Sequence, residues 1–261
     1  IYPFIWVILN SFKPRGLIRS DTFSLPIGDK FTLENYVTAF KRVDIGTAYV
    51  NSIVISGAVT VVVMVLAGLA AYAMVRYSFR LRGFLHSMII ASMMFPVFST
   101  LIPVFRMESS WGIVNTGSIW LTRLSVVLPQ IAGNLSFAII VLMGFIRSLP
   151  VDLEEAAYLE GYNVYQIFFR IIMPLAKPSF ATVGIFTFLW SYNDLFLQMF
   201  FLRSKKFFTI TRLLNEISSQ AGTNYGLMVA AVVMVVIPVL VVYIFLQNYI
   251  IKGMTAGAVK G

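Results

Sequence analysis

Residues 150–178 read PVDLEEAAYLEGYNVYQIFFRIIMPLAKP, and they interrupt an otherwise apolar chain with a charged segment. Asp152 is a favourable N-cap residue, and Glu155, three positions later, is placed to reach back to the free N–H groups of a helix that begins there. Gly161 predicts the end of this helix, because glycine adopts the left-handed conformation of a C-terminal cap at little cost. The pattern predicts a short helix of about two turns.

A second short helix is predicted directly after the first. Asn163, followed by Gln166 three positions later, repeats the capping pattern. Pro174 lacks an amide hydrogen and clashes with the preceding turn, so an undistorted helix is not expected to continue through it. The segment is therefore predicted to be two short helices joined by a turn.

The first of these helices is too short to cross a bilayer, which takes about 20 residues, and too short to be stable alone in water. Its glutamates and small residues suit a helix that lies in a groove of another protein. A solvated amphipathic loop, whose glutamates only cap and solubilise, is an equally open interpretation on physical grounds. The residues concerned are Glu154, Glu155, Ala156, Ala157 and Glu160.

The chain as a whole has the composition of a membrane protein. Of its 261 residues, 59% are hydrophobic and 12% are charged, and the mean hydropathy is +0.84. A soluble globular domain is less apolar than this. We therefore predict an all-α, polytopic bundle of transmembrane helices in a lipid bilayer.

Six spans are expected from the apolar runs. The first run, 1–12, is too short to cross about 30 Å of hydrocarbon and is interpreted as the outer end of a span that begins before this sequence. A short amphipathic helix or a structureless loop is expected at 31–40. Pro96 and Pro103 predict a kink or local unwinding in the third span. The other five spans are expected at about 46–75, 84–105, 124–146, 175–202 and 226–251.

Several kinds of chemistry are excluded by residues that the sequence lacks. It has no cysteine and one histidine, His86, so cysteine nucleophiles, disulfides and histidine-based metal clusters are excluded. It has no phosphate-binding loop of the form GxxxxGK[ST], so we expect no cofactor in this chain, and any use of ATP requires a partner. The net charge of +9 arises in loops, where lipid head groups account for it better than nucleic acid does.

The charged segment resembles the EAA loop of the membrane subunits of bacterial ATP-driven importers. In that family the pattern is EAA, then a glycine, then I-x-L-P. Met173 stands here in place of the leucine, which conserves volume. The tail from Gln247 onward resembles the maltose-type carbohydrate branch of the same family. The matching loop residues are Glu155, Ala156, Ala157, Gly161, Ile171, Met173 and Pro174.

This resemblance implies a function and a set of partners. The chain would be a single transmembrane permease domain, 1–261, of a carbohydrate importer in the bacterial inner (plasma) membrane, and not an enzyme. It would pair with a second permease, two cytoplasmic ATPase subunits that bind ATP and Mg²⁺, and an extracytoplasmic solute-binding protein. The loop 150–178 would couple to the ATPase through Glu155, Ala156, Ala157, Glu160, Gly161, Tyr162, Ile171 and Pro174.

Two other segments gain a role from the same resemblance. The C-terminal tail, 252–261, would reach the interface between the ATPase subunits, with Lys260 and Gly261 at its end. The outer loop, 203–225, would approach the solute-binding protein.

Asp194 is an acidic residue well inside an apolar run, in LWSYNDLFLQMF. An acidic side chain at membrane depth usually faces a cavity or a partner. The family often has Trp-Asn-[Asp/Glu] here, so Tyr192 replaces the tryptophan, whereas Asn193 and Asp194 match. We expect these three residues to serve the substrate pathway or the structure rather than to carry protons.

Two rival functions and one contrary observation stay open. A proton-driven secondary transporter with Asp194 as the carrier would leave the EAA pattern unexplained, and a membrane enzyme or scaffold would lack a visible catalytic pair. More basic residues fall in the expected outer loops than in the inner ones, so the positive-inside rule alone favours the opposite orientation. The expected orientation rests on the EAA resemblance, because an ATPase partner must lie in the cytosol.

Overall fold

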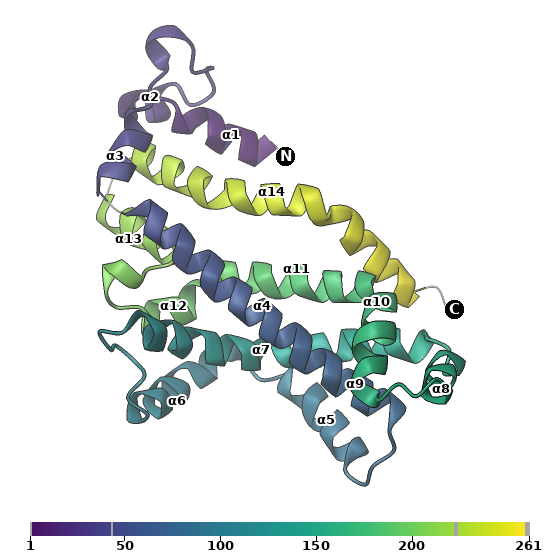
Figure 1. Ribbon diagram of the computed structural model, residues 1–261. Coiled ribbons are helices and arrows are strands. Elements are labelled where there is room, and N and C mark those ends of the chain that lie inside the picture. The colour runs from purple at the N-terminus through teal and green to yellow at the C-terminus, as the bar shows by residue number, and fades with distance from the viewer. Residues whose placement is uncertain (1, 43, 222–223, 259–261) are drawn as a thin grey trace.

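The computed structural model describes residues 2–42, 44–221 and 224–258, and every regular element in these ranges is helical. Figure 1 shows the long helices stacked beside one another in a bundle. The predicted all-α fold is therefore confirmed. The expected spans, however, differ in how continuous they are.

The centre of the bundle is formed by α4 (Ile45–Arg76), α7 (Ile119–Ser148) and α11 (Lys177–Asn193). Asp44 caps α4 by accepting a hydrogen bond from the amide of Thr47 at 2.9 Å. Small residues let the helices approach closely. A Cβ atom on Gly68 would lie 2.8 Å from the ring of Phe180 on α11. The buried core between the three helices includes Val59, Val63, Ala67, Leu142, Ile146, Phe180 and Val183.

The expected third span is broken into α5 (Arg82–Ser92) and α6 (Val97–Ser110). Pro96 precedes α6 with an extended backbone and so separates the two helices, as predicted. Pro103 lies inside α6 without ending it. The predicted interruption of the span is therefore present at Pro96, whereas α6 continues as a helix through Pro103.

The segment after α7 contains α8 (Asp152–Leu159), α9 (Val164–Ile167), a π-helical turn (Phe168–Ile172) and α10 (Met173–Leu175). The chain then bends by 82° into α11. The expected fifth span does not continue straight to 202. It stops at Asn193, and α12 (Leu195–Phe201) begins after Asp194.

The remaining helices lie mostly along one side and at one end of the bundle. In Figure 1, α1 (Tyr2–Ser11) runs beside α14 (Tyr225–Ala258). The amphipathic helix expected at 31–40 is present as α3 (Glu34–Arg42), and Thr32 accepts a hydrogen bond from the amide of Glu34. The other elements are α2 (Arg15–Ser20), the 3₁₀ turns Gly28–Lys30 and Lys205–Phe207, and α13 (Ile210–Ala221).

Two helices of the described chain, α4 and α7, are each long and apolar enough to cross a membrane unaided. The bent pair Val164–Leu175 and Lys177–Asn193 would make a third span if it is counted as one, and Tyr225–Val241 is a shorter apolar helix. Six spans therefore stay a prediction. Figure 1 places α8 and α9 at the end of the bundle opposite to α2, α3 and α13. The charged loop and the expected outer loops thus lie on opposite sides.

Candidate functional site

The short helix α8 is fastened to the end of α4 by a buried ion pair. The Nε atom of Arg76 lies 2.5 Å from Oε1 of Glu154, and the hydroxyl of Tyr72 donates to Oε2 of the same carboxylate at 2.7 Å. Arg76 also donates to the carbonyl of Leu149 at 2.9 Å. Glu154 is 4% exposed. Both oxygens of its carboxylate are therefore satisfied inside the protein, which a buried charge requires.

A second contact joins the same two helices nearer the surface. The hydroxyls of Tyr158 on α8 and Tyr77, directly after α4, are 3.1 Å apart. This hydrogen bond, together with partial burial, raises the pKa of Tyr158 to about 12. Helix α8 is thus held by α4 at two points.

The turn and caps predicted for residues 150–178 are confirmed in part. Gly161 has φ +87°, the left-handed conformation predicted for it. Asn163 and Gln166 form the predicted reciprocal capping box, with hydrogen bonds of 2.9 and 2.8 Å. The predicted cap at Asp152 is wrong. Val151 already has helical backbone angles and precedes the helix, so the side chain of Asp152 makes no cap.

As predicted, the second helix does not run undistorted through Pro174. The π-helical turn Phe168–Ile172 inserts an extra residue per turn just before it, and the helix continues to Leu175. A π-helical turn changes the backbone hydrogen-bond pattern of the helix, and proline, which lacks an amide hydrogen, cannot complete the regular pattern. Ala176 follows the end of this helix, and the chain bends there toward α11.

The outer face of α8 is exposed and mixes apolar with acidic residues. Leu159 is 91% exposed, Tyr158 46% and Leu153 42%. Ala157 faces the other way and is buried. Of the predicted coupling residues, Glu155, Ala156, Glu160, Gly161 and Pro174 are exposed, Ile171 and Tyr162 are half-buried, and Ala157 alone packs inside.

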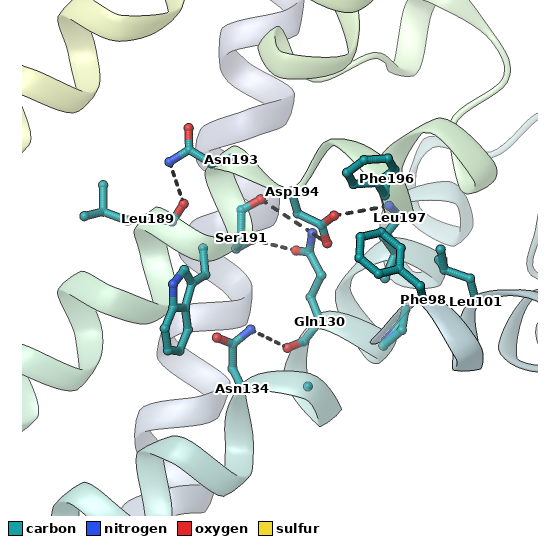
Figure 2. A pocket seen from close by; sticks show the side chains of 13 residues that line it. Phe98, Leu101, Gln130, Asn134, Leu189, Ser191, Asn193, Asp194, Phe196 and Leu197 are labelled. Carbon is teal, nitrogen blue, oxygen red and sulfur yellow. Dashed lines mark hydrogen bonds between the residues drawn. The ribbon is translucent and has the colours of Figure 1, made fainter. Parts of the chain in front are cut away.

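A cavity of about 490 Å³ lies between α6, α7, α11 and α12 (Figure 2). Asn193 and Asp194 line it, as expected for residues of a pathway. Tyr192 does not. Its ring is buried and stacks on Phe188 at 5.9 Å, so it serves the packing of α11.

The polar wall of the cavity is held by hydrogen bonds (Figure 2). Gln130 donates from Nε2 to Oδ2 of Asp194 at 3.0 Å, and its Oε1 accepts from the hydroxyl of Ser191 at 2.6 Å. The other carboxylate oxygen of Asp194 accepts from the amide of Leu197 at 3.1 Å and so caps α12. Asp194 therefore has a structural role as well as a place on the cavity wall.

The outer loop that follows α12 is tied to the start of α4. Asn51 donates to the carbonyl of Phe208 at 3.1 Å, and the amide of Ile210 donates to the hydroxyl of Ser52 at 2.8 Å. The loop is therefore an ordered surface that ends in α13. Lys260 and Gly261, which were expected to reach the ATPase interface, lie outside the described residues.

Comparison with known families decides which proteins this chain is related to. Residues 38–256 match the family described as the binding-protein-dependent transport system inner membrane component. The chain belongs to this family. It is thus a permease subunit of an ABC transporter and not an enzyme, as the resemblance implied, and it is an inner membrane component.

Curated members of the family are similar over nearly the whole chain. The diacetylchitobiose uptake system permease protein NgcG of Streptomyces coelicolor is 34% identical over 262 residues, which cover 100% of this chain and 84% of that protein. The trehalose transport system permease protein SugB of Mycobacterium tuberculosis is 32% identical, with 100% and 93% covered. The melibiose/raffinose/stachyose import permease protein MelC of Bacillus subtilis is 31% identical, with 99% and 91% covered.

Solved structures show the same fold. A bacterial ABC transporter involved in the import of the acidic polysaccharide alginate superimposes with a TM-score of 0.81 at 24% identity, covering 95% of this chain and 90% of that one. The same kind of transporter in complex with an alginate pentasaccharide-bound periplasmic protein gives a TM-score of 0.68 at 18% identity. The helical arrangement is therefore that of an importer permease.

Sequence reasoning grouped Glu154 with residues that suit a partner's groove and missed its buried pairing with Arg76. Reasoning from the EAA pattern selected Glu155, which is exposed. Glu154 and Ala157 are three positions apart and share the buried face of α8, a spacing that indicates one side of a helix. The partner Arg76, however, is 78 residues earlier, and no local pattern connects the two.

Proposed function

We propose that this permease forms half of the pathway of an ATP-driven saccharide importer in a bacterial inner membrane. Three curated relatives with known cargo carry diacetylchitobiose, trehalose, or melibiose with raffinose and stachyose, as their names state. A second, related permease would supply the other half of the pathway. An extracytoplasmic solute-binding protein would deliver the saccharide.

The observation that carries the coupling role is the construction of α8. A helix of eight residues is too short to stand alone, yet this one is fixed from behind by the buried pair of Glu154 with Arg76. Leu159, which is 91% exposed, and Leu153, which is 42% exposed, lie among exposed glutamates on the rest of the helix surface. Exposed apolar side chains on a fixed helix suit a groove of a second protein. We assign that groove to a cytoplasmic ATPase subunit.

The proposed transmission runs through contacts within this chain. Displacement of α8 pulls on Glu154, and through it on Arg76 and Tyr72 at the end of α4. Because α4 packs along α7 and α11, the pull reaches the helices that enclose the cavity. Gly161 sets the angle between α8 and α9, since its positive φ favours glycine.

The energy for this motion would come from two ATPase subunits. They would bind ATP and Mg²⁺, and closure of their dimer would move both coupling helices. Glu155, Ala156 and Glu160 would contact the ATPase directly, because they are exposed on or beside α8. The tail, 252–261, would reach the same partner. No cofactor is assigned to this chain.

The cavity would be part of the pathway, with Asn193 and Asp194 on its wall. The proton-driven alternative assigns Asp194 to proton carriage. Both of its carboxylate oxygens accept hydrogen bonds that hold α12 and Gln130 in place, which favours a fixed structural group. The loop 203–225 would meet the solute-binding protein at the outer side.

Reconstitution in proteoliposomes tests the proposal. The assembled importer is supplied with a saccharide-loaded binding protein outside and with ATP inside. We expect uptake that requires ATP and the binding protein and that persists when an ionophore removes the proton gradient. Uptake that needs the gradient and ignores ATP would contradict the proposal and favour the proton-driven alternative.

A further inference from the structure

The cavity between α6, α7, α11 and α12 has the features of a ligand site. Its volume of about 490 Å³ lies within the range of small-molecule pockets, which is roughly 300–1,000 Å³. Its lining combines aromatic side chains with a small set of polar groups, as such pockets do. The aromatic residues are Phe98, Trp190 and Phe196, and the polar ones are Gln130, Asn134, Asn193 and Asp194.

Neighbouring rings hold the aromatic side chains of the lining in place. Trp190 packs edge-to-face on Phe137 with ring centroids 4.9 Å apart, yet it remains 48% exposed. Phe98 and Phe196 pack on each other in the same manner, also at 4.9 Å. Rings that are fixed by neighbours and still exposed offer a flat apolar surface at little entropic cost. The axial C–H groups on one face of a pyranose form a matching flat apolar surface.

The polar wall contains an acceptor without a partner. Asn134 is 8% exposed, and its Nδ2 donates to the carbonyl of Gln130 at 2.7 Å. Its Oδ1 has no hydrogen-bond partner within the described protein. Figure 2 shows this oxygen turned away from Gln130. A buried acceptor is normally satisfied, so a donor from a bound ligand, such as a sugar hydroxyl, fits here.

The charge of the lining restricts the kind of sugar. Asp194 is the charged residue among the described residues that line the cavity. Hydroxyl groups donate well to a carboxylate and to an amide oxygen. A uronate would instead bring a second carboxylate beside Asp194 and would meet no cation among the lining residues. Like charges at close range disfavour such binding.

We propose that this cavity is a subsite for a neutral pyranose ring of the transported saccharide, stacked on Trp190 and hydrogen-bonded to Asn134 and Asp194. The proposal rests on the proposed function and names its substrate class. It places a sugar-selective site in this subunit itself. Discrimination against acidic sugars would then occur in the permease as well as in the binding protein.

Saturation-transfer NMR on the assembled importer in nanodiscs, without binding protein, tests this subsite directly. The probes are methyl glucoside and methyl galactoside, each paired with the uronide that differs only at C6. We expect saturation of the ring C–H protons of a neutral glycoside and at least about tenfold weaker binding of its uronide. The absence of saturation in both neutral glycosides, or equal binding of a neutral glycoside and its uronide, would overturn the proposal.

Three variants and one matched control assign the contacts. Trp190→Ala should weaken binding of the neutral glycoside about three- to tenfold, the range of one aromatic contact, and Trp190→Phe should weaken it less. Trp111→Ala, an exposed tryptophan beyond the cavity, is the matched control and should change nothing. Asp194→Asn keeps an acceptor for the cap of α12 and should reduce the discrimination against the uronide. Equal effects of Trp190→Ala and Trp111→Ala would contradict the stacking role.

The same preparation separates this proposal from the proposed function. If ATP-driven uptake of a saccharide is measured while the subsite variants leave binding unchanged, the subsite is wrong and the importer function stands. If no ATP-driven uptake occurs with any saccharide, the proposed function itself fails.

Discussion

The pair of Glu154 with Arg76 should decide whether α8 stays docked on the bundle. Replacing Arg76 by alanine leaves a carboxylate whose side chain is 5% exposed without its cation. Removal of one partner from a buried pair typically costs about 3–5 kcal/mol. A helix of eight residues has little intrinsic stability to offset this loss, so we expect α8 to detach while α4 and α7 remain folded.

Cysteine labelling measures the detachment. The chain has no cysteine, so a single Ala157→Cys substitution places one thiol under α8, at a position that is 4% exposed. A loss of about 3 kcal/mol raises the open population, and with it the labelling rate, by more than about 100-fold. Arg80→Ala removes an exposed arginine from the turn that follows α4 and is the matched control.

A double replacement sharpens this test. Glu154→Gln combined with Arg76→Met leaves no unpaired charge and should restore much of the protection that Arg76→Ala removes. The reasoning would be refuted if Arg76→Ala labelled at the rate of the Arg80→Ala control. It would also be refuted if the double variant labelled as fast as Arg76→Ala.

Three further predictions follow from single positions. Gly161→Val forces a β-branched residue to φ +87° at a strain of about 1–2 kcal/mol. We therefore expect ATP hydrolysis to continue while uptake falls. Equal uptake by the variant and the parent would contradict the role of this turn. Gly68→Ala should lower the melting temperature of the permease, because its Cβ meets the ring of Phe180. Gly57→Ala lies on the same helix with open space around it and should leave the melting temperature unchanged. Equal melting temperatures of the two variants would contradict the close contact between Gly68 and Phe180. Leu159→Lys should weaken copurification of the ATPase several-fold without changing the melting temperature, and an unchanged yield of ATPase would place the groove elsewhere.

The sequence predicted the turn and the second cap of residues 150–178, which depend on neighbouring residues, but not the start of the first helix, where the cap expected at Asp152 is absent. The glycine turn at Gly161 and the capping box at Asn163 are both present. The distortion predicted at Pro174 is present, but the sequence did not indicate its form, a π-helical turn just before the proline. The ion pair between Arg76 and Glu154 could not be predicted from the sequence either, because the two residues come together only when α4 and α8 pack in the fold.

The residues that line the cavity were also predicted from the sequence only in part. Asp194 was identified from its position in an apolar run and Asn193 from the family resemblance, and both line the cavity. Tyr192, their neighbour, points into the core, because successive residues of a helix face different directions. The contributions of Gln130 and Asn134 come from another helix, α7. No spacing within 187–202 could have indicated them.

Cross-linking from α8 to a partner tests the coupling role most directly. A single Leu159→Cys in the assembled importer should form a short cross-link to the ATPase subunit and should react with an impermeant maleimide only from the cytosolic side. Phe23→Cys, an exposed position in the loop at the opposite end of the bundle, should do neither. Labelling of Leu159→Cys from the outside, or a cross-link to the ATPase from Phe23→Cys alone, would contradict the account.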